Sequence, residues 1–467
     1  MAATREETDK MSFALELARR ASAITLDSVP TDAVRAATYA IADTLGVALA
    51  GSTAPYLDGL AAALGADGRQ GTASAIGRAG CYSVLHAALL NGTAAHGLDF
   101  DDCSTVMSGH PSAPVVAALL ALAEERGASG AAVLEAYLAG VEVEIHLARA
   151  VMPHHYDKGW HPTATLGVFG AAAASARLLN FDEGRLASTL AVAVSMASGI
   201  KSNFGSPVKP LHVGQAAFNG VLAAQTVAHG MTSNLSAFEH TYGFFEVFNG
   251  AGKFNAERAR DGWGDRFEIL EPGIAIKQHP CCGSAHSAID AALSIRRTVG
   301  KVDCDSVAAI EIWTHERRLA HTNRQAPSTG LEAKFSVQFL TAKALLAGMI
   351  GLRDFDDASF MTPDVAALLP RVVAYPHQEK NEYLGRVRVV LRDGTVLEHA
   401  ATTELGRNPF DLQASGDLER KFLDCTRGHL AEAKAGQLFS DILDVQNAPN
   451  MLHIMRTIAN QERAGKC

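Results

Sequence analysis

Apolar residues recur with helical spacing over the N-terminal half of the chain. From Ser12 to about Asn249, aliphatic and small residues return every three or four positions, as they do on the buried face of a helix. We therefore predict helices at 131–152, 164–179, 183–196 and 211–229, and an earlier helix that has Asp32 as its N-cap and ends at Gly51. Several of these segments are apolar on nearly all sides, so we expect them in the centre of a bundle or against a second subunit.

The pattern changes after about Phe267, where short segments with strand-like alternation begin. They predict strands at 273–277, 306–314, 371–375, 386–391 and 396–402, with helices at 284–299 and 333–347. Asp393-Gly394 between the last two strands is a strong hairpin signal. Helical spacing returns from Asp417 to about Ala459. We expect a mainly α fold: a large all-helical domain, formed by residues 1–267 and 406–467, and a smaller inserted α+β domain at 268–405.

Composition narrows the class of protein. The 467 residues are 48% hydrophobic and 19% charged, with a formal charge of −9, which indicates a large globular protein. No basic segment suggests nucleic acid or an anionic membrane as a partner, and no window offers about 20 apolar residues without polar breaks. The polar N-terminus, Met1 to Lys10, does not resemble a secretory signal. Seven cysteines without metal-ligand spacing fit a reducing compartment, so we expect a cytoplasmic protein.

One polar stretch, residues 91–103, interrupts the apolar helices. It lies between a helix expected at 82–90 and another expected from Pro111 to about Glu125. Charge at such a junction is costly to bury unless it is paired or used in chemistry. The stretch and the residues just after it hold three carboxylates and two histidines: Asp99, Asp101, Asp102, His96 and His110.

Three further polar clusters, residues 154–163, 201–214 and 277–286, lie at the ends of expected elements, where side chains can point into a cleft. Lysines and histidines near a carboxylate group suit a polyanionic substrate. The cations would bind substrate carboxylates and stabilise the enediolate-like charge that forms when a proton leaves the adjacent carbon. From residue type alone, His110, His161 and Asp99 are candidates for moving that proton.

Structural explanations compete at each of these positions. Asp101 and Asp102 also fit a charged pair at a helix N-terminus, and His96 and His212 fit structural hydrogen bonds. A solvated loop would account for His154 and His155, and small apolar packing would account for Cys281 and Cys282. A zinc site on His96, Asp99 and Asp101 matches no known spacing, so we expect no metal. Walker, dinucleotide and nucleophile-elbow motifs are absent from the sequence. Cofactor-free acid–base chemistry on a small carboxylate remains.

Taken together, the clusters resemble the MmgE/PrpD family over nearly the whole chain. The matching motifs occur in family order: Asp43-Thr-Leu-Gly46, His96-Gly-Leu-Asp99-Phe-Asp101-Asp102, Gly159-Trp-His161-Pro-Thr163, Lys209-Pro-Leu-His212-Val-Gly214, Lys277 with Pro280 and Cys281, and Glu332-Ala-Lys-Phe335-Ser336. The resemblance implies a large helical domain with a smaller α+β lid, a homodimer, and a small di- or tricarboxylate substrate. It also implies that the reaction needs neither metal nor organic cofactor.

The resemblance also assigns site residues by motif. The implied catalytic residues are His161, Lys209, Asp99 and His110, with His161 and Lys209 as the acid–base and carboxylate-binding pair. The implied substrate-binding residues are Lys277 from the lid, Cys103, His286 and Cys282. The decarboxylase pattern of the family has a histidine five residues after the lid lysine, where this chain has Cys282, and Cys103 replaces a threonine. His286 supplies the missing imidazole if its helix turns it inward.

These observations rank the possible functions. The leading hypothesis is a cofactor-independent lyase or isomerase that abstracts a proton next to a carboxylate. Dehydration of a 2-methylcitrate-like hydroxy acid ranks ahead of epimerisation of an iminodisuccinate-like substrate. Because of Cys282, cis-aconitate decarboxylation ranks lower. A homologue that binds carboxylates without turnover is the alternative from a different class.

Overall fold

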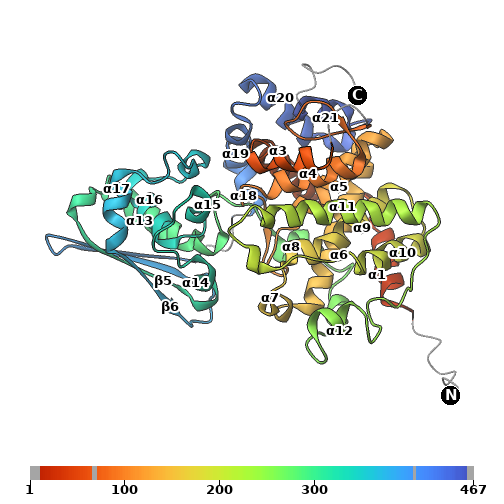
Figure 1. The fold of residues 1–467 in the computed structure, drawn as a ribbon, viewed down its shortest axis with the longest axis horizontal. Coiled ribbons are helices and arrows are strands. Elements are labelled where there is room, and N and C mark those ends of the chain that lie inside the picture. Colours follow the sequence, from red (N-terminus) through yellow and green to blue (C-terminus); the bar gives the residue numbers. More distant parts are fainter. Residues whose placement is uncertain (1–10, 66–70, 403–405, 407, 460–467) are drawn as a thin grey trace. The chain divides into compact units, whose positions relative to one another are not determined.

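The structure, a computed structural model, describes residues 11–65, 71–402, 406 and 408–459. Within this part, the chain forms two compact units: unit 1 comprises residues 11–97, 101–274 and 409–459, and unit 2 comprises residues 98–100 and 275–408 (Figure 1). Met1 to Lys10, interpreted above as a non-secretory terminus, and residue 405, the predicted end of the inserted domain, lie outside the described residues.

Unit 1 is built almost entirely of helices. Its helices are α1 (Phe13–Ser22), α2 (Thr31–Gly51), α3 (Pro55–Ala63), α4 (Val84–His96), α5 (Ser112–Arg126), α6 (Gly130–Val151), α7 (His154–Lys158), α8 (Pro162–Thr165), α9 (Gly167–Leu178), α10 (Glu183–Val194), α11 (Val208–Ala228), α12 (Phe244–Asn249), α18 (Pro409–Ala414), α19 (Asp417–Thr426), α20 (Glu432–Leu443) and α21 (Leu452–Ile458). Two-residue strands, β1 (Ala73–Ser74), β2 (Cys81–Tyr82) and β3 (Cys103–Ser104), interrupt them. The helices predicted from periodicity are present, with ends shifted by a few residues.

Two predicted helix boundaries are wrong. Helix α2 begins at Thr31 after Pro30, so Asp32 lies in its first turn, where it pairs with Arg35 at 3.1 Å, and does not cap it. Helix α4 continues to His96, because small residues after Leu90 keep the helix apolar and buried. Helix α2 has the length and composition of a membrane span, but 89% of its most apolar window is buried, as in a core helix.

Helices α4 and α11 pack with their backbones almost in contact. A Cβ atom at Gly92 of α4 would lie 2.8 Å from the Cα atom of Gly214 on α11, and a Cβ atom at Gly214 would lie 2.2 Å from the carbonyl oxygen of Leu89. Only glycine permits this approach. The close contact sets the last turn of α4 beside the first turns of α11.

Unit 2 is an α+β unit. Its sheet has the order β6-β5-β7-β8; β5 and β6 are parallel and the other neighbours antiparallel. The strands of this sheet are β5 (Val307–His315), β6 (Val372–His377), β7 (Gly385–Leu391) and β8 (Val396–Ala401), and the helices are α13 (His286–Val299), α14 (Glu316–Thr322), α15 (Gly330–Ala333), α16 (Val337–Ala347) and α17 (Pro363–Leu368). The two-residue strand β4 (Ile274–Ala275) lies at the sequence boundary of the two units. The hairpin predicted at Asp393-Gly394 joins β7 to β8.

The core of unit 2 lies between its sheet and its helices. Ile310 of β5 and Val387 of β7 are completely buried, together with Ile289 of α13 and Phe339 of α16. Alternate residues of the two strands therefore face the helices, in agreement with the alternation of apolar residues in the sequence. Figure 1 shows α13 and α16 along the sheet.

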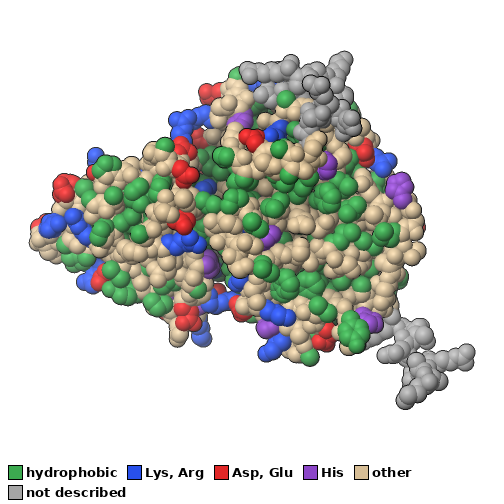
Figure 2. Space-filling view, in the orientation of Figure 1, with side chains coloured by type: hydrophobic (Ala, Val, Ile, Leu, Met, Phe, Trp, Pro, Cys, Tyr) green, Lys and Arg blue, Asp and Glu red, His purple; other side chains and the backbone are tan. Residues whose placement is uncertain are grey.

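The outer side of α11 is uncharged, with the exposed Gln215 among partly exposed apolar residues. Leu211, Phe218 and Leu222 are partly exposed and share one side of the helix. In Figure 2, the face of unit 1 that carries α11 shows mainly hydrophobic and uncharged side chains. The homodimer expected from the sequence stays a prediction.

Candidate active site

Four imidazole rings from four separate segments gather in unit 1. His96 ends α4, His110 precedes α5, His161 precedes α8, and His212 lies near the start of α11. Ring centres are 4.5 Å apart for His96 and His110, 5.6 Å for His96 and His161, and 5.5 Å for His161 and His212. The structure thus brings the predicted His110 and His161 together with two histidines to which the sequence gave structural roles.

Asp101 orients two of these rings. Its Oδ2 atom lies 2.8 Å from Nδ1 of His96, and its Oδ1 atom lies 3.2 Å from Nδ1 of His110. Burial favours the neutral carboxyl, but the two histidines outweigh it and hold the pKa of Asp101 well below its usual range. Sequence reasoning considered Asp101 as part of a charged pair or a metal site and gave it no catalytic role. The signal that could have singled it out is its position between His96 and His110.

Two buried rings of the cluster, those of His96 and His161, are neutral bases. Burial lowers the pKa of His96 to about 4, and it lowers the pKa of His161 well below the usual range, with further contributions from His96 and Lys209. His161 is only 2% exposed. A neutral imidazole can accept a proton at pH 7, which is the requirement for a general base. The Nε2 atom of His96 is buried and has no hydrogen-bond partner among the described residues, so it is available to a bound polar group.

Lys209 brings a positive charge to the same cluster. It is the second residue of α11 and is 7% exposed. Its ammonium lies 5.3 Å from the centre of the Phe204 ring, and that ring meets His161 edge-on at 4.9 Å. Its charge helps to lower the pKa of His96, His161 and His212. The cluster therefore places neutral bases beside a cation that can bind a carboxylate.

Backbone contacts fix the loop that carries Cys103 and His110. The backbone N–H of His110 donates to Oγ1 of Thr163 at 3.2 Å, and a Cβ atom at Gly109 would lie only 3.1 Å from that oxygen. The Sγ atom of Cys103 lies 3.7 Å from Nδ1 of His110. Cys103, predicted to bind substrate, thus lies inside the histidine cluster.

Asp102 lies at a helix N-terminus, as the structural interpretation of the sequence expected. The backbone N–H and the hydroxyl of Ser112, the first residue of α5, both donate to its carboxyl group. The Tyr137 hydroxyl lies 2.6 Å from Oγ of Ser112 and extends this series of hydrogen bonds. Burial, with smaller contributions from Asp43 and Asp101, raises the pKa of Asp102 to about 7 against the effect of Ser112. Asp102 therefore anchors the loop to α5.

Asp99 and Lys277 form an ion pair in unit 2. Nζ of Lys277 lies 2.9 Å from Oδ1 of Asp99 and 2.8 Å from its backbone oxygen, and Lys277 is 1% exposed. Asp99 has a left-handed backbone with φ of 54°. The catalytic role of Asp99 and the substrate-binding role of Lys277 stay predictions.

His286 points into unit 2. It is the first residue of α13 and 1% exposed, and its ring centre lies 5.1 Å from that of His279, which contacts Asp290 at 3.0 Å. Burial, followed by His279 and Lys277, lowers the pKa of His286 well below the usual range. Its Nε2 atom has no hydrogen-bond partner among the described residues.

The two adjacent cysteines differ in reactivity. Cys281 is completely buried, and burial raises the pKa of its thiol well above the usual range, so it serves as apolar packing. Cys282 is partly exposed; although burial opposes it, the hydrogen bond and charge of His321 lower the pKa of Cys282 to about 7. Packing thus accounts for Cys281 but not for the acidic thiol of Cys282. Elsewhere in the described chain, Cys81 is disulfide-bonded.

The solvated-loop interpretation of His155 is wrong. His155 lies on α7 and is completely buried. Its Nε2 atom is 2.7 Å from Oγ1 of Thr165, and its Nδ1 atom is 3.1 Å from Oδ1 of Asn249. It supports the segment next to His161 structurally. His154, also on α7, is half-buried and contacts the backbone oxygen of Asn249.

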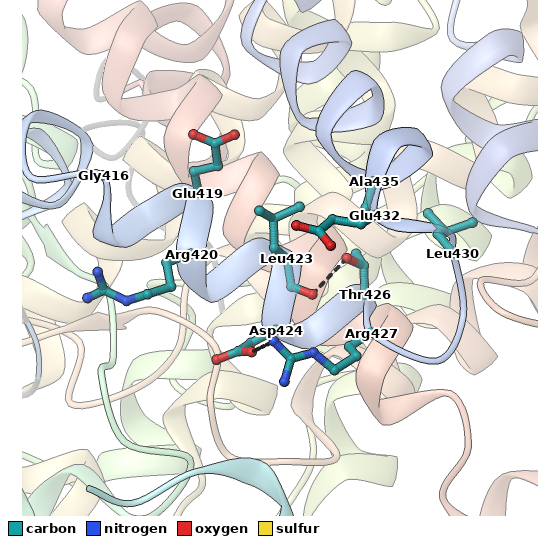
Figure 3. A pocket seen from close by; sticks show the side chains of 10 residues that line it. All are labelled: Gly416, Glu419, Arg420, Leu423, Asp424, Thr426, Arg427, Leu430, Glu432 and Ala435. Atoms are coloured by element: carbon teal, nitrogen blue, oxygen red, sulfur yellow. Dashed lines mark hydrogen bonds and ion pairs between the residues drawn. The ribbon is translucent and has the colours of Figure 1, made fainter.

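A separate pocket of about 350 Å³ lies between α19 and α20 (Figure 3). Its lining includes Leu423, Asp424 and Arg427, and the last two form an ion pair at 2.8 Å. None of the predicted site residues lines it. We therefore place no chemistry there.

A mainly helical chain that buries neutral imidazoles beside a lysine has the features of an acid–base enzyme. The chain matches the MmgE/PrpD N-terminal domain over residues 15–257 and the MmgE/PrpD C-terminal domain over residues 279–444, and it belongs to the MmgE/PrpD family. It is 30% identical to cis-aconitate decarboxylase of Homo sapiens, over 72% of this chain and 71% of the relative. It is 24% identical to cis-aconitate decarboxylase of Aspergillus terreus, over 85% and 86%. The chain is therefore an enzyme of the MmgE/PrpD type, a lyase or isomerase.

Proposed function

We propose that this enzyme moves a proton at a carbon next to a carboxylate of a small di- or tricarboxylate, and that His161 and Lys209 carry the reaction. The observation that supports this most strongly is the buried, neutral His161 beside the Lys209 ammonium. A polycarboxylate offers the anionic group for the lysine and the acidic C–H bond for the imidazole.

In the forward step of a dehydration, Lys209 binds the substrate carboxylate and a ring nitrogen of His161 takes the proton from the adjacent carbon. The C–H electron pair moves into the carboxylate and forms an enediolate-like anion beside the ammonium. The positive charge of Lys209 stabilises this anion more than it stabilises the bound substrate. That difference lowers the activation barrier.

The remaining bond changes depend on the reaction. In a dehydration, the enediolate-like anion expels the hydroxyl group: the carbon–oxygen bond breaks, a double bond forms, and a protonated histidine such as His110 gives its proton to the leaving hydroxide. A decarboxylation has no preceding proton abstraction: a carbon–carbon bond to a carboxylate breaks, CO₂ leaves, and an imidazolium protonates the carbon that receives the electron pair. Both need an imidazole that can hold and release one proton next to a cation.

Two observations favour different reactions. The relatives reported above carry the name cis-aconitate decarboxylase, which favours decarboxylation. Cys282, five residues after Lys277, stands where the decarboxylase pattern has a histidine and favours a dehydration of a 2-methylcitrate-like acid. Decarboxylation is therefore a second candidate reaction, and its support is at least as strong as that for dehydration. Epimerisation remains a possible outcome of the test.

Proton NMR of the purified protein in D₂O tests the proposal. The panel is 2-methylcitrate, citrate, cis-aconitate and iminodisuccinate, with a heat-denatured control and a parallel sample in EDTA. Loss of a C–H signal with a new alkene signal indicates dehydration, loss of CO₂ from cis-aconitate indicates decarboxylation, and exchange without an alkene indicates epimerisation. A folded protein that is thermally stabilised by a substrate but changes none of the spectra would contradict the proposal and favour the carboxylate-binding alternative.

A further inference from the structure

His161 shares a ring nitrogen contact with His212. Their Nδ1 atoms are 3.3 Å apart. Within the described part of the chain, this contact is the one hydrogen bond that the His161 ring makes. A neutral imidazole has one N–H donor and one nitrogen acceptor. The contact is a hydrogen bond only when one of the two Nδ1 atoms carries a proton and the other does not.

The position of that proton decides what His161 can do. When Nδ1 of His161 donates, its Nε2 atom has a lone pair and can act as a base. When Nδ1 of His212 donates, a neutral His161 carries its proton on Nε2 and can act as an acid. The hydrogen bond to His212 therefore selects between the two chemical states of His161.

The two rings differ in how readily each holds a positive charge. His161 is 2% exposed, faces Lys209 and His96, and would pay a large desolvation cost as an imidazolium. His212 is half-buried and closer to water. When Nε2 of His161 takes a proton from the substrate, transfer of its Nδ1 proton to His212 leaves His161 neutral. The positive charge then resides on His212.

The backbone fixes this pair. The N–H of His161 donates to the carbonyl oxygen of Gly199 at 3.0 Å. A Cβ atom at Gly199 would lie 3.4 Å from the His212 ring and 3.0 Å from Cβ of Ala164, and Gly199 has φ of 118°. The same glycine thus holds the backbone of His161 and packs against the ring of His212. This arrangement keeps the two Nδ1 atoms facing each other.

We propose that His212 is a positioning residue that sets the proton position on His161 and receives its Nδ1 proton during turnover. The turnover part rests on the proposed function, whereas the tautomer part concerns the resting protein. The two parts can therefore be tested separately.

The first test measures the resting protein. The protein is labelled with ¹⁵N-histidine, and the His161 ring signals are assigned by their loss in His161→Gln. In His212→Phe, we expect the His161 Nδ1 and Nε2 shifts to move, because the hydrogen bond at Nδ1 is lost. His161 shifts that stay the same in a folded His212→Phe protein would overturn the proposal, whatever the substrate turns out to be.

The second test measures turnover of a substrate identified from the NMR panel. We expect His212→Phe to lower kcat about 10- to 100-fold, as when a functional histidine loses an orienting partner, with KM changed less than about twofold. His212→Asn, whose amide can occupy the Nδ1 position, should recover part of kcat. His229→Phe, at the exposed end of the same helix, is the matched control and should behave as wild type. Unchanged kcat, or no recovery in a folded His212→Asn, would overturn the role in turnover.

Discussion

The Oδ2 atom of Asp101 lies 2.8 Å from Nδ1 of His96, and both side chains are fully buried. Asp101 has a pKa far below its usual range, while burial lowers the pKa of His96 to about 4, so the carboxylate is ionised and the ring is neutral at pH 7. Nδ1 of His96 is therefore the donor, and the lone pair on Nε2 faces the interior without a partner among the described residues.

We expect Asp101→Asn to lower kcat by about 10²-fold or more with little loss of thermal stability. An amide has one oxygen to accept a hydrogen bond and cannot replace a carboxylate that faces His96 and His110 together. Initial rates on the substrate found by NMR measure the effect. The exposed Asp265→Asn variant serves as the control. An Asp101→Asn enzyme with wild-type kcat would remove Asp101 from the site.

Lys209→Ala should fold normally and lose most of its activity. The substitution removes the cation that we propose binds the substrate carboxylate, and general experience with such electrostatic groups indicates a loss of about 10²- to 10³-fold. The measurement is kcat/KM, with thermal melting as the check on folding. Lys253→Ala, which removes an exposed lysine, is the matched control. Near wild-type turnover would show that Lys209 has no part in the mechanism.

His161→Gln should slow exchange of the substrate proton at least as much as it weakens binding. Glutamine keeps a polar side chain of similar length but cannot accept and release a proton at pH 7. Exchange is followed in D₂O and binding by thermal shift. The pKa of His161 lies well below 6.5. We therefore expect that protonation of His161 does not lower the wild-type exchange rate as the pH falls through 6.5. An unchanged exchange rate in the variant would assign His161 a structural role.

Asp102→Asn should change how stability depends on pH. The folded pKa of Asp102, about 7, exceeds the usual value of 3.8, so folding is favoured by the protonated form. That contribution is present below pH 3.8 and is lost as pH rises through 7. Between pH 5.5 and 8, the free energy of unfolding of the wild type should fall by about 2 kcal/mol relative to the variant. Urea unfolding of both proteins at pH 5.5 and at pH 8 measures this difference. An equal change in the free energy of unfolding of wild type and variant would contradict the raised pKa of Asp102.

Cys282 should be the first of the free thiols to react with iodoacetamide at pH 7.5. Its pKa of about 7 makes much of the thiol reactive thiolate, whereas burial, followed by Asp305, raises the pKa of the partly exposed Cys304. Peptide mass spectrometry against time gives both rates in one sample. His321→Ala should slow Cys282 several-fold and leave Cys304 unchanged. Faster labelling of Cys304 than of Cys282 in the wild type would contradict this.

The pattern of apolar and turn-forming residues close together in the sequence predicted much of the secondary structure. The spacing of apolar residues predicted α6, α10 and α11, and Asp393-Gly394 predicted the β7–β8 hairpin, because each signal depends only on residues close in sequence. The end of α4 was missed, since small residues after Leu90 carry no stop signal of their own. The motifs also pointed to His110, His161 and Lys209, which the structure brings into one cluster.

The partners of these residues were decided by tertiary structure alone. Asp99, a predicted catalytic residue, pairs with Lys277, and Asp102 anchors Ser112 at the start of α5. The pairing of His161 with His212 joins residues 51 positions apart. The close packing of α4 on α11 at Gly92 and Gly214 brings such rings together. The sequence by itself determined which residue types and elements were present. Long-range packing decided which proton each imidazole can hold, because that depends on the group opposite each ring nitrogen.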